Sequence, residues 1–226
     1  MRNIPAFACE FGVVSLILQE IPSQGAAYCT VQWAQPGKLP ALLAQCDAFC
    51  RAAGAKIVYA DRPPVPGQAP AIVLRRMTGK KSAIPPSGDE LVMLDEENWP
   101  QFLALYRQAM APVPGAASLR PADLPRLLQC GGCYLVQRQG HLLGIGQVSG
   151  NQLLSIAAAE RGRGLAVAAA LLSLCPGPEL TLTVAESNGR AIALYRKMGF
   201  QPDTIETQYW ILERTNHGTT GVSQGD

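Results

Sequence analysis

The chain has 226 residues, of which 48% are hydrophobic and 16% are charged. This length and apolar content suffice for a packed core and exclude a disordered chain. The net charge of +2 comes from 19 Lys and Arg against 17 Asp and Glu, with no dense basic run, which argues against a nucleic-acid partner.

The first 80 residues predict a small α/β domain. Residues 38–53 place apolar side chains at helical spacing and stop before Gly54, which predicts a helix. Residues 61–70 hold four prolines and cannot be a helix interior. The expected strands are 6–19, 26–35, 56–60 and 71–77, with a turn at 22–25 between the first two.

A polar, proline-rich segment at 81–88 predicts a linker, and 89–214 a second α/β domain. Its expected strands are 90–94, 133–138, 142–148, 153–157, 179–185 and 205–212. Its expected helices are 96–110, 121–129, 162–174 and 188–198. The polar, glycine-rich tail at 215–226 predicts disorder.

The strongest chemical signal is a glycine-rich turn between the strand at 153–157 and the helix that follows it. Gly162 and Gly164 allow close approach of a ligand to the backbone, and Arg161 and Arg163 add positive charge. Unpaired N–H groups at a helix N-terminus bind anions and suit a pyrophosphate. An ordinary tight turn with two surface arginines is the simpler alternative. Neither a Walker loop nor a dinucleotide fingerprint fits these residues.

A second signal begins at Asn188, at the expected start of the 188–198 helix. Tyr195 lies two turns further along and shares a face with Asn188 and Ala191. The small residues on this face allow a ligand to lie close to the helix. A half-buried core tyrosine with a satisfied hydroxyl is the alternative.

Together these segments resemble the GCN5-related N-acetyltransferase (GNAT) superfamily, over roughly residues 89–214. Arg161-x-x-Gly164-x-Ala166 resembles its acyl-CoA pyrophosphate motif, and the next motif is similar to Ser187-Asn188-x-x-Ala191-x-Ala193-Leu194-Tyr195 followed by Gly199-Phe200. The similarity is greatest to the branch that acetylates ribosomal-protein N-termini, the ribosomal-protein-alanine acetyltransferases. It implies an α/β fold with a mixed, mostly antiparallel sheet flanked by helices.

The resemblance also implies acetyl transfer from acetyl-CoA to a primary amine by direct attack, without a metal. The backbone of Leu154, Ser155 and Ile156 would pair with the pantetheine arm. The turn and the first helical residues would hold the pyrophosphate: Gly162, Arg163, Gly164, Leu165, Ala166 and Val167. Asn188 would bind the CoA arm, and Tyr195 would protonate the leaving thiolate.

The sequence departs from the family pattern where a general base is expected. In the resembling branch a glutamate precedes Asn188 on the strand, and Thr183 stands at that position. Glu186 and Glu160 are weak substitutes, because both favour the surface. A non-catalytic acyl-CoA-binding regulatory module therefore stays open as an alternative, as does a partner-binding domain with no CoA site. The acceptor is open among peptide N-termini, polyamines, aminoglycosides and small metabolites.

Other features predict a cytoplasmic protein with no membrane partner. No apolar run approaches the roughly 20 residues of a membrane span, and Glu10 interrupts the N-terminal apolar stretch where a signal peptide would lie. The seven cysteines suit reduced thiols. Four of them, at 46, 50, 130 and 133, could form a zinc site if the two halves docked, but packed free thiols are the simpler interpretation. The N-terminal domain resembles a degenerate half of the same acetyltransferase fold, with an unrelated α+β domain as the alternative.

Overall fold

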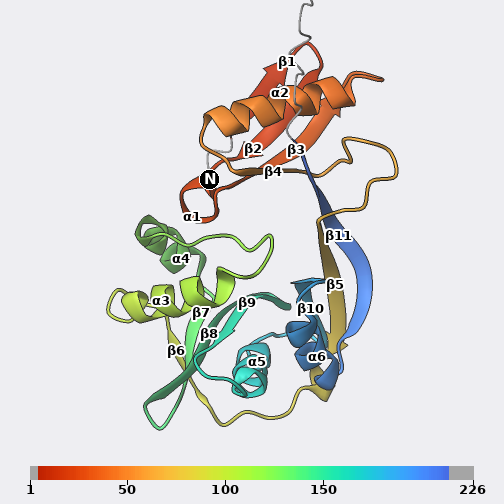
Figure 1. Ribbon diagram of the computed structural model, residues 1–226. Helices are drawn as coiled ribbons and strands as arrows, with labels where there is room; N and C mark the ends of the chain where they lie inside the picture. The colour runs from red at the N-terminus through yellow and green to blue at the C-terminus, as the bar shows by residue number, and fades with distance from the viewer. Residues whose placement is uncertain (1–4, 214–226) are drawn as a thin grey trace, which may run out of the picture. The chain divides into compact units, whose positions relative to one another are not determined.

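The computed structural model describes residues 5–213. They form two compact units, the first made of residues up to 71 together with 209–213, the second of residues 72–208. Both units are mixtures of strands and helices (Figure 1), as the sequence predicted. The tail at 215–226 lies outside the described residues.

The first unit is a sheet that carries one long helix. Strands β1 (Ala6–Cys9), β2 (Gly12–Ile17) and β3 (Ala26–Ala34) pair antiparallel in chain order. Helix α2 (Leu39–Ala52) leads to β4 (Ile57–Ala60), which is parallel to β3. The end of β11 (Gln201–Ile211) pairs antiparallel with β4. A buried apolar cluster that includes Leu42, Cys46, Val14 and Val58 joins α2 to the sheet.

Two local predictions in this unit were wrong. The single strand expected over 6–19 is two strands, because a turn at Glu10 and Phe11 folds β2 back onto β1. The expected turn at 22–25 is a short helix, α1 (Ile21–Gln24), which ends at Gly25 with a φ of 67°. A left-handed φ favours glycine, so Gly25 ends the helix as a C-cap.

The second unit contains the remaining elements. Its strands are β5 (Ile72–Lys80), β6 (Glu90–Met93), β7 (Cys133–Arg138), β8 (His141–Ser149), β9 (Gln152–Ala158), β10 (Glu179–Ala185) and the beginning of β11. Its helices are α3 (Trp99–Met110), α4 (Leu124–Cys130), α5 (Gly164–Ser173) and α6 (Gly189–Lys197), with 3-10 turns η1 (Lys81–Ala83) and η2 (Pro121–Asp123). The strand order in its sheet is β11-β5-β10-β9-β8-β7-β6.

Strand β5 comes before the expected linker in the chain, whereas the other elements of this unit come after it. It pairs antiparallel with β10 along seven residues, from Leu74 to Lys80. The segment 81–88 therefore connects two strands of the same unit and begins with η1. The assignment of 81–88 as a linker between domains stays a prediction.

Side chains on alternate strand residues build two separate cores in the second unit. Leu135 of β7 and Ala157 of β9 lie in the cluster that contains α3. Their strand neighbours Val136 and Ile156 lie in, or pack against, the cluster that contains α5 and Tyr195 of α6. Because neighbouring strand residues point to opposite faces of a sheet, α3 covers one face and α5 the other.

Close packing of α5 on the sheet depends on glycines in β8. A Cβ on Gly146 would lie 2.3 Å from Leu171 Cδ1 and 2.6 Å from the Ser155 carbonyl oxygen. Neither a buried leucine nor a strand backbone can move away freely, so a side chain here forces α5 or β9 outward.

We expect Gly146→Ala to lower the free energy of unfolding by about 1–3 kcal/mol, because it overpacks this contact. Thermal unfolding followed by circular dichroism measures the change. Gly88→Ala is the matched control, since a Cβ at Gly88 meets nothing within 4 Å. Equal midpoints for the two variants would contradict the packing argument.

The two units repeat one order of elements. In the first, three antiparallel strands (β1, β2, β3) lead through α2 to the parallel β4. In the second, three antiparallel strands (β7, β8, β9) lead through α5 to the parallel β10. The predicted likeness of the N-terminal region to a degenerate half of the acetyltransferase fold stays a prediction.

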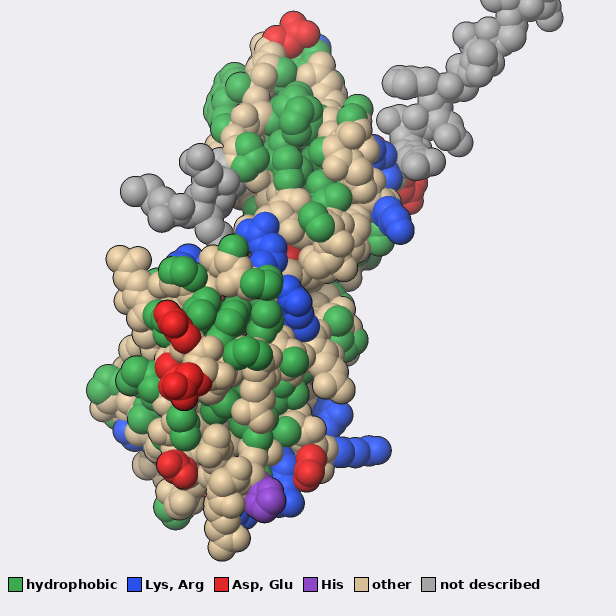
Figure 2. Space-filling model, turned by 90° about the vertical axis from the view of Figure 1, so that its left-hand side faces the viewer, with side chains coloured by type: hydrophobic (Ala, Val, Ile, Leu, Met, Phe, Trp, Pro, Cys, Tyr) green, Lys and Arg blue, Asp and Glu red, His purple; other side chains and the backbone are tan. Residues whose placement is uncertain are grey.

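The surface is consistent with the low charged fraction of the sequence. On the face drawn in Figure 2, basic and acidic side chains are scattered among larger hydrophobic and uncharged areas. Within residues 5–213, the structure contains no helix of the length and apolarity that a bilayer crossing requires. The same residues hold no group of three or more His, Cys, Asp or Glu suited to a metal ion.

Candidate active site

The sheet of the second unit opens where β9 and β10 stop pairing. Their parallel ladder consists of Gln152 with Thr181 and Leu153 with Leu182. Beyond Leu153, the β10-facing edge of β9 has no strand partner, while β10 continues to pair with β5 on its other side. A strand edge with unpaired N–H and C=O groups is a template for an extended ligand.

A β-bulge in β9 lies at this point. Gln147 of β8 faces Ser155 and Val148 faces Leu153, so Leu154 between them has no partner on β8. Bulges leave one residue outside the ladder and bend the strand, and they are common beside active sites. The bulge therefore bends β9 at the point where its β10-facing edge opens.

The open edge of β9 leads directly into the turn before α5. Among residues 5–213, the N–H groups of Gly162, Gly164, Leu165 and Ala166 have no hydrogen-bond acceptor. The turn needs glycine at 162, where φ is 91°, and a Cβ there would meet nothing within 4 Å. The helix therefore presents several free donors at the positive end of its dipole, which is an arrangement that binds anions.

Two other backbone N–H groups of this turn are engaged within the protein. Val167 donates to the Arg163 carbonyl at 3.1 Å, and Arg163 donates to the Glu160 carbonyl at 3.3 Å. Neither N–H group is therefore a free donor for a ligand.

The two arginines of the turn are exposed cations. Arg163 makes a long ion pair with Glu160, with 3.5 Å between Nε and Oε2, and both side chains are largely in water. Arg161 has no hydrogen bond or ion pair within the described part of the chain. Exposed pairs of this kind are worth little, so both guanidinium groups remain available to an anion.

Asn188 caps helix α6. Its side-chain Oδ1 accepts a hydrogen bond from the Ala191 N–H at 3.1 Å. This satisfies one of the free N–H groups at the helix start and stabilises the helix by about 1 kcal/mol. The position of Asn188 at the start of this helix was predicted from the sequence, and the capping hydrogen bond uses its side-chain oxygen.

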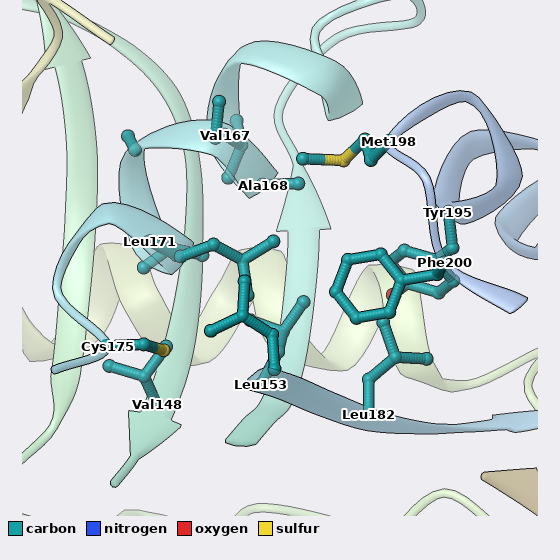
Figure 3. Close-up of a cluster of buried hydrophobic side chains, with 14 of the residues drawn as sticks. Val148, Leu153, Val167, Ala168, Leu171, Cys175, Leu182, Tyr195, Met198 and Phe200 are labelled. Carbon is teal, nitrogen blue, oxygen red and sulfur yellow. The ribbon is translucent and has the colours of Figure 1, made fainter. Parts of the chain in front are cut away.

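Tyr195 of α6 lies in the core beside the parting strands. Its side chain is 5% exposed and clusters with Leu153 and Leu182, the last paired residues of β9 and β10. Figure 3 shows it beside Phe200 and Leu182, and the rings of Tyr195 and Phe200 are 6.0 Å apart between centroids. The hydroxyl has no hydrogen-bond partner among residues 5–213.

Burial raises the pKa of Tyr195 to about 12. The phenol therefore stays protonated throughout the physiological pH range and has a proton to give. Since the unfolded tyrosine titrates near 10, this group's contribution to stability is complete below pH 10 and is lost as the pH rises towards 12.

The acidic residues near this region are engaged in ion pairs. Glu186, the weak candidate for a base, forms an ion pair with Arg75 of β5. Glu206 of β11 accepts a hydrogen bond from the Thr183 hydroxyl and another from Arg76 Nε at 2.8 Å. Sequence reasoning missed Glu206, because its two partners lie on strands that are more than 20 residues away in the chain.

Known proteins resemble this chain in structure more than in sequence. No family model matches the sequence, and no curated protein matches it. A conserved protein of unknown function from Staphylococcus epidermidis aligns over 95% of both chains, with a TM-score of 0.60 and 10% identity.

Two further solved structures carry an acetyltransferase description. A GCN5-related N-acetyltransferase from Sphaerobacter thermophilus aligns over 88% of this chain and 75% of its own, with a TM-score of 0.57 and 17% identity. A GNAT-family acetyltransferase from Colwellia psychrerythraea aligns over 90% and 82%, with a TM-score of 0.52 and 14% identity.

These alignments define the fold class. The chain has the fold of the GCN5-related N-acetyltransferases, with a mixed, mostly antiparallel sheet flanked by helices, as the sequence motifs predicted. Identities of 10–17% establish a fold and not an activity. The ribosomal-protein-alanine branch stays a prediction.

Proposed function

We propose that the second unit transfers an acetyl group from acetyl-CoA to a primary amine. One observation carries the proposal: the open edge of β9 leads into four unpaired N–H groups in the turn before α5 and at the start of that helix. The strand edge offers hydrogen bonds to an extended arm that carries amides, and the turn next to it offers hydrogen bonds to a diphosphate. Pantetheine diphosphate has these two parts in the same order.

The backbone supplies most of the proposed cofactor contacts. Gly162, Gly164, Leu165 and Ala166 donate their N–H groups to the diphosphate, with Arg161 and Arg163 adding charge from the rim. The open edge from Leu154 to Ile156 pairs with the pantetheine amides as an added strand would. The buried Ser155 Oγ, which has no partner among residues 5–213, fits a ligand on this strand.

The proposed reaction is a direct attack on the thioester. The nitrogen of a neutral amine forms a bond to the acetyl carbon, and the C–S bond breaks as CoA leaves. In this proposal the backbone N–H of Leu154, at the bulge, donates to the carbonyl oxygen where negative charge develops. Tyr195 gives its proton to the departing thiolate, and the amine proton restores the phenol.

Asn188 has a smaller part in this proposal. Its Oδ1 holds the helix that carries Tyr195, and its Nδ2 has no partner within the described residues. That amide group is the one left to contact the CoA arm.

A second candidate function is acyl-CoA binding without catalysis. It is favoured by the engagement of the nearby carboxylates, since Glu186 is paired with Arg75 and Glu206 with Arg76 and Thr183. Release of CoA thiol in the presence of amines distinguishes the two functions, because a binding module releases none.

We propose that the first unit is a copy of the same half-fold in which the two parallel strands do not part. Its parallel pair β3 and β4 holds four residue pairs, from Ala26 with Ile57 to Cys29 with Ala60. Asp61 then continues along the β3 edge, where its N–H donates to Cys29 and its Oδ1 accepts from Val31 N–H, both at 3.0 Å. No edge is left open there for a pantetheine arm.

We therefore expect each chain to bind one acetyl-CoA, and to release CoA thiol when a primary amine is supplied. Isothermal titration calorimetry measures the stoichiometry, and a thiol-reactive dye measures turnover with spermidine, an alanine-initiated tripeptide and kanamycin as acceptors. Two sites per chain would contradict the closed first unit. Binding without thiol release would favour the regulatory module.

A further inference from the structure

Two hydroxyl groups flank the parting strands on the α3 face of the sheet. Ser155 is two residues before Ala157, which packs in the α3 cluster, so both point to that face. Thr183 follows Leu182, which packs in the opposite cluster, so Thr183 also points to the α3 face. Ser155 belongs to β9 and Thr183 to β10, and both come just after the last residue pair of the two strands.

The hydroxyl of Ser155 indicates that this face receives a ligand. Its Oγ is buried and has no hydrogen-bond partner within residues 5–213. Leaving a buried polar group unpaired costs about 1–3 kcal/mol. Native structures keep few such groups, and a ligand contact is one reason for keeping them.

The hydroxyl of Thr183 has its proton committed. It donates to Glu206 Oε2, while Glu206 Oε1 accepts from Arg76 Nε at 2.8 Å. Burial raises the pKa of Glu206, but the hydrogen bonds from Thr183 and Arg76 outweigh it and leave the pKa lowered. Glu206 is therefore an ionised, acceptor-only group at neutral pH. The hydroxyl proton of Thr183 stays in the hydrogen bond to this carboxylate.

A hydroxyl whose single proton is committed can only accept a further hydrogen bond. The lone pairs of Thr183 Oγ1 thus remain for a donor that arrives at the parting strands. An attacking amine is such a donor, because it can give one N–H to Thr183 while its lone pair stays free for the acetyl carbon.

We infer that Thr183 accepts a hydrogen bond from the attacking amine, and that Glu206 and Arg76 are positioning residues that keep Thr183 in this state. The inference rests on the proposed acetyl transfer and adds the contact that orients the acceptor. Glu206 itself is a poor general base, because a lowered pKa weakens its pull on a proton at neutral pH.

The test compares Thr183→Val with Thr181→Val. Thr181 lies two residues earlier on the same face of β10, before the strands part, and its hydroxyl has no partner within the described residues. The probe amines are spermidine and an alanine-initiated tripeptide, with thiol release giving kcat and KM. Calorimetry gives the acetyl-CoA dissociation constant of each variant.

We expect Thr183→Val to lower kcat/KM for the amine by about tenfold, the worth of one hydrogen bond, with acetyl-CoA affinity unchanged. Thr183→Ser should restore the rate to within about threefold. Glu206→Gln should lower kcat/KM alone but add nothing to Thr183→Val, because both act through one hydroxyl.

The outcomes separate this inference from the proposed function. If the wild-type chain turns over a probe amine and Thr183→Val behaves like Thr181→Val, the Thr183 contact is overturned and acetyl transfer stands. If the acetyl-CoA affinity falls in step with kcat/KM, the role of Thr183 is structural and the inference is also overturned. If the wild-type chain releases no thiol with either amine, the transferase function fails and this inference fails with it.

Discussion

Gly164→Glu abolishes acetyl-CoA binding if the start of α5 holds the diphosphate. The new carboxylate stands at the first residue of the helix, among the free N–H groups of Leu165 and Ala166. A carboxylate there is itself stabilised by the helix dipole, so it competes for the donors and repels the phosphates. We expect the dissociation constant measured by calorimetry to rise more than 100-fold, which corresponds to about 2.8 kcal/mol.

Gly164→Ala is the matched control for this change. A Cβ at this position meets only Leu194 Cδ2, at 3.2 Å, and that methyl group is the end of a flexible side chain. The alanine variant keeps the N–H and adds no charge, so it should retain affinity within about tenfold of the wild type. Undiminished acetyl-CoA binding by the glutamate variant, with its unfolding midpoint unchanged, would contradict the assignment of the diphosphate to this turn.

Tyr195→Phe should lower kcat by about 10²-fold or more, the usual loss when a proton donor is removed. The phenyl ring keeps the packing against Phe200, and the lost hydroxyl has no partner among residues 5–213, so stability should change little. Acetyl-CoA affinity should also stay the same, because the proton is needed only as the thiolate leaves. Steady-state thiol release and calorimetry give the two quantities.

Tyr134→Phe tests whether loss of any core hydroxyl has this effect. Tyr134 of β7 is partly buried against the same cluster as Tyr195 and has no side-chain hydrogen bond within residues 5–213. Its removal should leave kcat unchanged. Small and equal effects of the two substitutions would reject Tyr195 as the acid.

Local sequence patterns predicted much of the second unit. Strand 179–185 was expected and is found with the same bounds, since it alternates apolar and polar residues directly after a Pro-Gly-Pro segment. The start of α6 at Asn188 follows from a capping residue next to the helix it caps. The amides before α5 could be anticipated because helix ends leave N–H groups free wherever glycine keeps the turn open.

Features that depend on distant parts of the chain could not be predicted. The pairing of β5 with β10 joins residues about 100 positions apart, and no local pattern of 72–80 indicates its partner. The bonds of Glu206 to Thr183 and Arg76 arise from three strands brought together. The turn that separates β1 from β2 was missed because it contains only Glu10 and Phe11. A single polar residue in an apolar stretch is equally compatible with one continuous strand.

The site shows the same division between local and distant causes. The family resemblance implied donors across residues 162–167, but only the backbone hydrogen bonds distinguish the engaged Val167 from the free Ala166. Likewise the sequence placed Tyr195 two turns into a helix. Its burial and unpartnered hydroxyl depend on Leu153, Leu182 and Phe200, which come from other elements.

A crystal structure of the chain grown with CoA tests the central claim most directly. We predict the diphosphate within hydrogen-bond distance of the N–H groups of Gly164, Leu165 and Ala166, the pantetheine amides along the open edge of β9, and the sulfur near the Tyr195 hydroxyl. CoA bound at any other surface, with those three N–H groups facing only water, would contradict it.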